Sequence, residues 1–160
     1  MTVELPARIH ATTIALAGAA AVIRGASGAG KSDLALRCLM MAPNALVSCG
    51  AEFVSDDYTE LFLQDNAVFA RPPAEIANLL EVRGLGIVEI KAVASARVTL
   101  VVDLAEASSI ERMPGQAMQV GVAGRTFPAL RLHAAESSAP AKLLLALDFV
   151  RRHGRLPTIE

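Results

Sequence analysis

Apolar and polar residues alternate along the chain in short β-type runs, with two longer stretches of helical spacing. Residues 9–16 and 20–24 are rich in Thr, Ile, Ala and Val, and Ala17-Gly18 between them predicts two strands joined by a tight turn. A glycine-rich segment, 25–30, follows the second run. Apolar residues then recur at helical spacing over 31–41, which predicts a helix directly after the glycines.

The middle of the chain predicts mainly strands. Residues 45–49 and 53–55 are apolar runs of strand length. Two further runs, 61–63 and 67–69, enclose Asp65-Asn66, which is typical of a hairpin turn. The pair Pro72-Pro73 then predicts a short helix over residues 74–80.

The last third combines strands with a terminal helix. The β-rich runs are 87–90, 97–104, 119–122 and 130–132, with a predicted surface loop over 105–116 and a predicted helix over 140–152. No repeat or linker divides the chain. We therefore predict a single α/β domain over residues 1–160, with a central mixed β-sheet flanked by helices.

Composition and charge narrow the class of protein. At 160 residues with 53% apolar and 19% charged residues, the chain is long and apolar enough to bury a core. Its 15 basic and 16 acidic side chains give a net charge of -1, so we expect no nucleic-acid partner. The two cysteines, Cys38 and Cys49, lack metal-ligand spacing and are interpreted as buried thiols in a reducing compartment.

The apolar run from Thr12 to Ile23 is too short to cross a membrane. It holds 12 residues, contains Gly18 and leads directly into Arg24, so it resembles neither a spanning helix nor a secretory signal. We therefore expect a cytoplasmic protein with no membrane partner.

The glycine-rich segment satisfies the Walker A pattern G-x-x-x-x-G-K-[ST] at every defined position, between an apolar strand and an amphipathic helix. Small residues let backbone N–H groups approach a phosphate, and the start of the helix adds positive dipole. Lys31 is expected to bridge the β- and γ-phosphates of ATP, and the Ser32 hydroxyl to bind Mg²⁺. The predicted cofactors are thus ATP and Mg²⁺, held by Gly25, Ala26, Ser27, Gly28, Ala29, Gly30, Lys31 and Ser32.

The adjacent carboxylates Asp56 and Asp57 follow the predicted strand 53–55. Neighbouring residues of a strand point to opposite faces, so the two acids perform different tasks unless the strand ends between them. One is expected to face Mg²⁺ and the other to accept the proton of the attacking hydroxyl; spacing alone does not rank them.

The third candidate motif combines an acid and an arginine with two glycines: Glu81, Arg83, Gly84 and Gly86. The glycines indicate a backbone that bends tightly or approaches a ligand, with Glu81 as a candidate Mg²⁺ ligand and Arg83 beside the phosphates. A helix end followed by glycine would give the same letters.

Together these blocks resemble the catalytic domain of HPr kinase/phosphorylase, which phosphorylates a serine of the phosphocarrier protein HPr. The matching blocks are Ile9-His10, Gly25 to Ser32, Val54-Ser55-Asp56-Asp57, and the signature Glu81-Val82-Arg83-Gly84-Leu85-Gly86-Ile87-Val88. The resemblance implies a protein serine kinase with an HPr-like substrate.

The same resemblance implies roles for individual residues. Asp57 becomes the proton acceptor, His10 the active-site histidine and Lys31 the phosphate-binding lysine. The resemblance assigns Mg²⁺ to Ser32 and Glu81. With Asp57 as the proton acceptor, Asp56 is the acid that we expect to face Mg²⁺. A catalytic arginine aligns with Arg112, with Arg97 as its rival.

Longer family members are hexamers, which implies a homo-oligomer, and their N-terminal domain has no counterpart in these residues. Their arginine-rich segment for dephosphorylation finds no match in 130–142, which leaves phosphorolysis of the phosphoserine open. Two other classes stay as alternatives: a P-loop kinase for a small metabolite, and a nucleotide-dependent switch without transfer activity. A metabolite kinase needs an arginine-bearing lid, and a guanine-reading switch needs Asn-Lys-x-Asp; neither pattern is evident.

Overall fold

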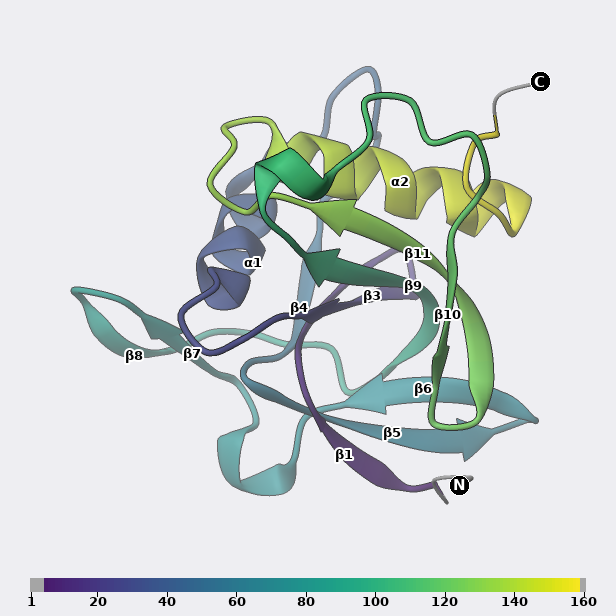
Figure 1. The fold of residues 1–160 in the computed structure, drawn as a ribbon. Coiled ribbons are helices and arrows are strands. Elements are labelled where there is room, and N and C mark those ends of the chain that lie inside the picture. The colour runs from purple at the N-terminus through teal and green to yellow at the C-terminus, as the bar shows by residue number, and fades with distance from the viewer. Residues whose placement is uncertain (1–4, 159–160) are drawn as a thin grey trace.

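A computed structural model describes residues 5–158 and shows strands and helices in one mixed arrangement (Figure 1). In chain order the strands are β1 (Ala7–His10), β2 (Thr12–Leu16), β3 (Ala19–Arg24), β4 (Glu52–Ser55), β5 (Tyr58–Gln64), β6 (Ala67–Arg71), β7 (Leu79–Val82), β8 (Gly86–Glu89), β9 (Ala96–Leu104), β10 (Gln119–Val122) and β11 (Arg125–Leu132). The helices are α1 (Lys31–Met40) and α2 (Ala139–His153), with the short 3-10 turns η1 (Ala74–Ile76) and η2 (Ala107–Ser109).

A curled mixed sheet forms the centre of the molecule, in the order β1-β5-β6-β9-β3-β2-β4. β3 and β9 run parallel, whereas β2 is antiparallel to both β3 and β4. β9 pairs with β6 at its beginning and with β11 over its second half, and β10 pairs with β11. The predicted mixed sheet is confirmed.

Both helices lie on the same face of this sheet, so the sheet is covered by helices on one side only (Figure 1). Leu34 of α1 and Leu143 and Leu147 of α2 pack there against Ile14 and Ile23. The other face is closed by the curl of the strands themselves, over a second core that includes Val22, Val54, Leu61, Val101 and Phe127. Two faces of one sheet thus carry two apolar cores.

Cys38 belongs to the core beneath the helices. Its side chain is fully buried, and burial raises the pKa of the thiol to about 12, offset only in part by the charge of Arg37. Cys49 is partly buried, and both thiols are free. The pKa of Cys38 makes this thiol a poor nucleophile.

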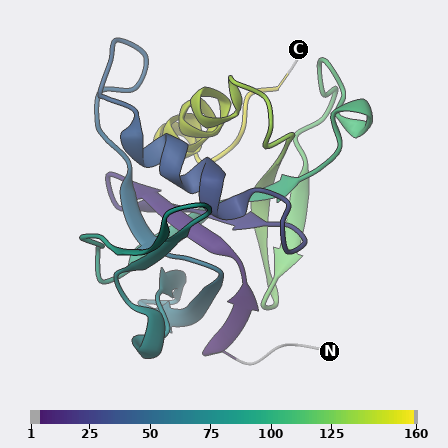
Figure 2. The ribbon, with the colours of Figure 1, turned by 90° about the vertical axis from the view of Figure 1, so that its left-hand side faces the viewer.

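The hairpin of β7 and β8 is a separate two-stranded sheet beside α1. It projects from the body in Figure 1 and lies in front of the body in Figure 2. Its turn places Gly84 at φ 83° and Gly86 at φ 116°. These are left-handed conformations that favour glycine, so the predicted tight bend is confirmed. The segment before Gly84 is a strand, which excludes the helix-end interpretation of the same letters.

Two predicted elements were wrong. Residues 45–49 form a loop, because the side chain of Asn44 accepts the amides of Leu46 and Val47 at 2.9 and 3.1 Å and so offers this backbone a local alternative to a strand partner. The predicted helix 74–80 is reduced to η1, because Asn78 takes a left-handed φ of 66° and the chain then pairs as β7.

Other boundaries shifted because a strand changes its partner. The predicted strand 9–16 divides at Ala11: β1 pairs with β5, whereas β2 pairs with β3 and β4. β11 begins earlier than predicted, since its first half pairs with β10. The turns at Ala17-Gly18 and Asp65-Asn66 and the two helices are confirmed. Within residues 5–158 no helix is both long and apolar enough to span a bilayer.

Candidate active site

The glycine-rich loop joins the end of β3 to the first turn of α1, as the Walker A pattern predicts. Gly30 stands at the N-cap with φ 102°, and a Cβ there would lie 3.1 Å from the Cβ of Ala134. Gly25 is equally confined, because a Cβ at this position would lie 3.2 Å from the Cβ of Leu104. The loop is therefore a tight backbone cradle at the positive end of a helix, which suits an anionic ligand.

Lys31 is folded back over this loop. Its Nζ donates to the carbonyl oxygens of Gly25 and Ala26 at 2.8 and 3.0 Å, and only 6% of the residue is exposed. The loop carbonyls hold the ammonium group in place, and a phosphate entering the cradle would exchange those acceptors for stronger, charged ones.

Asp56 is buried directly behind Ser32. The Ser32 hydroxyl donates to Asp56 Oδ1 at 2.5 Å, the Thr12 hydroxyl donates to the same oxygen at 3.0 Å, and the Glu81 amide donates to Oδ2 at 3.1 Å. The residue is 5% exposed, so these donors replace the water that an ionised carboxylate would otherwise bind. The acid is thereby fixed against the P-loop serine.

Asp57 faces away from Asp56 and into solvent. β4 ends at Ser55, and Asp57 takes φ 65°, which turns its carboxylate out of the core with 58% of the side chain exposed. His10 Nε2 lies 2.8 Å from Asp57 Oδ1, and the imidazole ring packs near Tyr58. The two neighbouring carboxylates therefore differ in environment: Asp56 is buried behind the Ser32 hydroxyl, and Asp57 is open to solvent.

Glu81 lies on β7 with its backbone amide bonded to Asp56 and its side chain exposed. This contact brings the projecting hairpin to the acid pair, by which we mean Asp56 and Asp57. A P-loop serine, a buried aspartate and a nearby glutamate are oxygen donors, the kind that Mg²⁺ takes alongside phosphate oxygens and waters. Within residues 5–158 no group of three or more His, Cys, Asp or Glu side chains is placed to hold a metal ion.

Arg24 and Asp103 form an ion pair that sequence reasoning missed. Arg24 Nε and Nη2 donate to the two carboxylate oxygens of Asp103 at 2.8 and 2.9 Å, which joins the ends of the parallel strands β3 and β9 beside the loop. The hydrogen bond to Asp103 raises the pKa of Arg24, against the opposing effect of burial. In the sequence, this ion pair is signalled by Asp103, an acidic residue that directly follows the β-rich residues 98–102.

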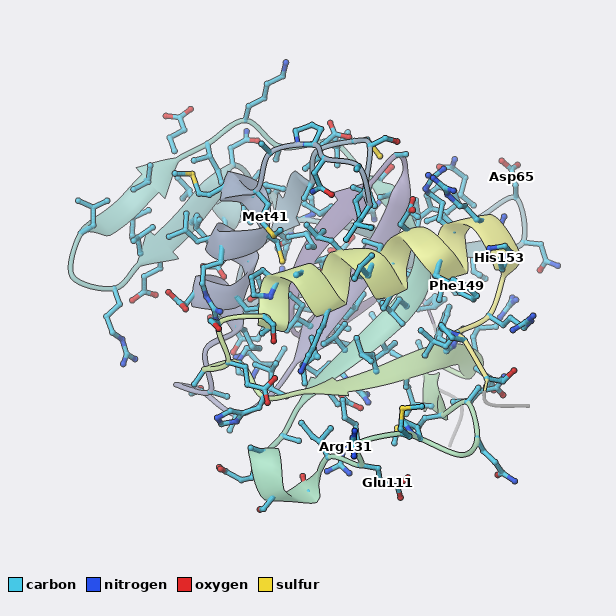
Figure 3. All side chains as sticks on the ribbon, turned by 90° about the horizontal axis from the view of Figure 1, so that it is seen from above. Met41, Asp65, Glu111, Arg131, Phe149 and His153 are labelled. Carbon is cyan, nitrogen blue, oxygen red and sulfur yellow. The ribbon has the colours of Figure 1, made fainter. Side chains whose placement is uncertain are left out.

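Neither candidate catalytic arginine is brought to the acid pair. Arg97 pairs with Ala19 at the start of β3, the end remote from the P-loop, and its amide binds the Gly18 carbonyl at 3.1 Å. Arg112 is exposed in the loop after η2. Figure 3 shows its neighbour Glu111 beside Arg131, across the molecule from the β7–β8 hairpin.

Thr12 is the other residue that sequence reasoning missed. In the sequence it belongs to an apolar run, yet its buried hydroxyl bonds to the Asp56 carboxylate and to the Asp57 backbone amide. No pattern of spacing marks it, because the contact joins residues 44 and 45 positions apart.

A strand, a glycine-rich loop and a helix, with a carboxylate bonded to the loop serine, define a P-loop protein. The chain belongs to the HPr Serine kinase C-terminal domain family, whose family model matches residues 3–150.

Similar proteins agree with this assignment. The chain is 35% identical to the HPr kinase/phosphorylase of Variovorax paradoxus over 112 residues, or 65% of this chain and 33% of that protein. It is also 35% identical to the HPr kinase/phosphorylase of Lactococcus lactis subsp. lactis over 83 residues, or 51% of this chain and 24% of that protein. The chain thus spans about a third or less of the length of these relatives.

A solved structure shares the fold. The HPr(Ser) kinase/phosphatase from Coxiella burnetii superposes with a TM-score of 0.73 at 19% identity, covering 92% of this chain and 90% of that chain.

Proposed function

We propose that this chain is an ATP- and Mg²⁺-dependent kinase that phosphorylates a serine of an HPr-like phosphocarrier protein in the cytoplasm. The observation that carries the proposal is the divided acid pair: Asp56 bonded to the P-loop Ser32, and Asp57 exposed next to His10. Family membership supports the same activity.

In this proposal the P-loop amides and Lys31 bind the β- and γ-phosphates of ATP. Ser32, Asp56 and Glu81 would hold Mg²⁺, which neutralises charge on the phosphate oxygens. Asp57 accepts the proton of the substrate serine as its Oγ forms a bond to the γ-phosphorus and the bond from that phosphorus to the bridging oxygen breaks. The products are phosphoserine, ADP and a proton on Asp57.

His10 orients the acceptor carboxylate. Its Nε2 lies against Asp57 Oδ1, which directs the carboxylate and leaves Oδ2 on the exposed side chain for the incoming hydroxyl. A rigid, exposed carboxylate suits a bulky acceptor such as a protein serine, because the acceptor then needs no deep pocket.

The test compares wild type with Asp57→Asn, using γ-labelled ATP, Mg²⁺ and purified HPr. Asparagine tolerates the left-handed backbone of Asp57 but cannot take the proton. We expect label on wild-type HPr and a loss of transfer of at least about a hundredfold in Asp57→Asn, with Mg²⁺–ADP affinity retained.

Asp65→Asn is the matched control, since Asp65 is also a left-handed, exposed aspartate but lies in the β5–β6 turn. It should transfer phosphate at the wild-type rate. Label on a small metabolite of a cell extract instead of HPr would replace the protein-kinase proposal with a metabolite kinase, and binding of ATP with no transfer would favour a nucleotide-dependent switch.

A further inference from the structure

Thr12 stands between the two aspartates of the candidate active site. Its hydroxyl donates to Asp56 Oδ1 at 3.0 Å and accepts the backbone N–H of Asp57 at 3.2 Å. One hydroxyl has one donor and two acceptor positions, so both bonds form at the same time. The residue is 0% exposed, and water cannot take over either bond.

The first bond fixes the direction of the buried carboxylate. Asp56 receives donors from three elements: Thr12 of β2, Ser32 of α1 and the Glu81 amide of β7. Thr12 and Ser32 share Oδ1, so the position of the Thr12 hydroxyl decides how that oxygen meets the P-loop serine. Loss of this donor would free the carboxylate to rotate away from Ser32.

The second bond fixes the backbone of the exposed acid. Asp57 holds φ 65°, a conformation that L-residues adopt with difficulty, between the Thr12 hydroxyl at its amide and the Ala11 amide at its carbonyl, the latter at 2.9 Å. Ala11 and Thr12, at the junction of β1 and β2, thus hold the backbone turn at Asp57 that places its carboxylate beside His10.

We infer that Thr12 is a positioning residue for phosphoryl transfer, which sets the metal-facing Asp56 and the proton-accepting Asp57 relative to each other. It touches neither substrate nor metal and acts through these two acids. The inference rests on the proposed function and deepens it by adding a residue outside the P-loop, the acid pair and the signature.

Thr13 offers a matched control for a merely structural role. It is also 0% exposed and also hydroxyl-bonded, to Thr59 Oγ1 at 2.8 Å, but it faces the core on the opposite side of the sheet. Removing its hydroxyl costs a comparable buried hydrogen bond without touching either aspartate.

The experiment measures ADP affinity by calorimetry with and without Mg²⁺, together with kcat for transfer to HPr. For Thr12→Val we expect Mg²⁺–ADP affinity to fall about tenfold and kcat about ten- to a hundredfold, while affinity for metal-free ADP changes less than about twofold. Thr12→Ser keeps the hydroxyl and should restore both values to within about threefold of wild type. Thr13→Val should leave both values unchanged while lowering the melting temperature.

Equal behaviour of Thr12→Val and Thr13→Val would overturn the inference. Should Thr12→Val fail to fold, Thr12→Cys replaces it: its thiol takes the place of the hydroxyl but is a much weaker hydrogen-bonding group, so it should lose Mg²⁺-dependent affinity relative to Thr12→Ser. A wild-type protein that binds Mg²⁺–ADP but labels no HPr would contradict the proposed function alone, since the calorimetric comparison still decides the role of Thr12.

Discussion

At the scale of single residues, the site depends on backbone conformations that few residues tolerate. Gly30 in the P-loop takes φ 102°, and Asp57 in the acid pair takes φ 65°. At the first position only glycine fits, because of both φ and the nearby Ala134. At the second, hydrogen bonds from neighbouring strands hold an aspartate in place.

Gly30→Ala should weaken nucleotide binding. A left-handed alanine costs about 1 to 2 kcal/mol, and its Cβ would press on Ala134, so we expect Mg²⁺–ADP affinity to fall about tenfold or more in calorimetry. Gly115→Ala is the control, because a Cβ there meets nothing within 4 Å. Unchanged affinity in Gly30→Ala would contradict the cradle described for the loop.

At the scale of elements, α2 covers the sheet face that carries the P-loop strand. Leu143, Leu144, Leu147 and Val150 are buried along its inner side, and α1 packs beside it. The same core surrounds Leu34 at the start of α1. Packing of α2 therefore supports α1, the helix that begins at the end of the P-loop.

Leu147→Ala should destabilise the fold, and Leu145→Ala should not. Leu147 is 0% exposed and Leu145 is 42% exposed, so the pair holds helix propensity constant and changes only burial. In urea unfolding followed by circular dichroism we expect a loss of about 2 to 5 kcal/mol for Leu147→Ala and less than about 0.5 kcal/mol for Leu145→Ala. Similar losses in both variants would mean that α2 does not pack as described.

At the scale of the whole molecule, β3 and β9 each contribute residues to both cores. Ile23 and Val102 face the helices, whereas Val22 and Val101 face the curled strands. Arg24 and Asp103 tie the carboxyl ends of the same strands together. Opening of these strands would expose both cores, which makes them the most stable part of the fold.

Native-state hydrogen exchange should follow this order. We expect the amides of Val22 and Val101 to exchange only by global unfolding, at least about a thousandfold more slowly than those of β8, which belongs to a largely exposed two-stranded hairpin. The β8 amides serve as the internal comparison, and equal protection of the two groups would contradict this picture.

The sequence by itself determined the features that depend on near neighbours. The P-loop, the helix after it, the terminal helix and the turns at Ala17-Gly18 and Asp65-Asn66 follow from local spacing and from residues suited to turns. Local propensity failed where a side chain or a new strand partner intervened, at the loop 45–49 and at β7.

Only the tertiary structure decided how the acids are divided and which residues hold them. Sequence spacing left Asp56 and Asp57 unranked; the fold buries the first behind Ser32 and turns the second toward His10. Thr12, Asp103 and the remote position of Arg97 likewise depend on strands that are distant along the chain. A hydrogen bond between residues more than 40 positions apart is set by strand register, which no local pattern encodes.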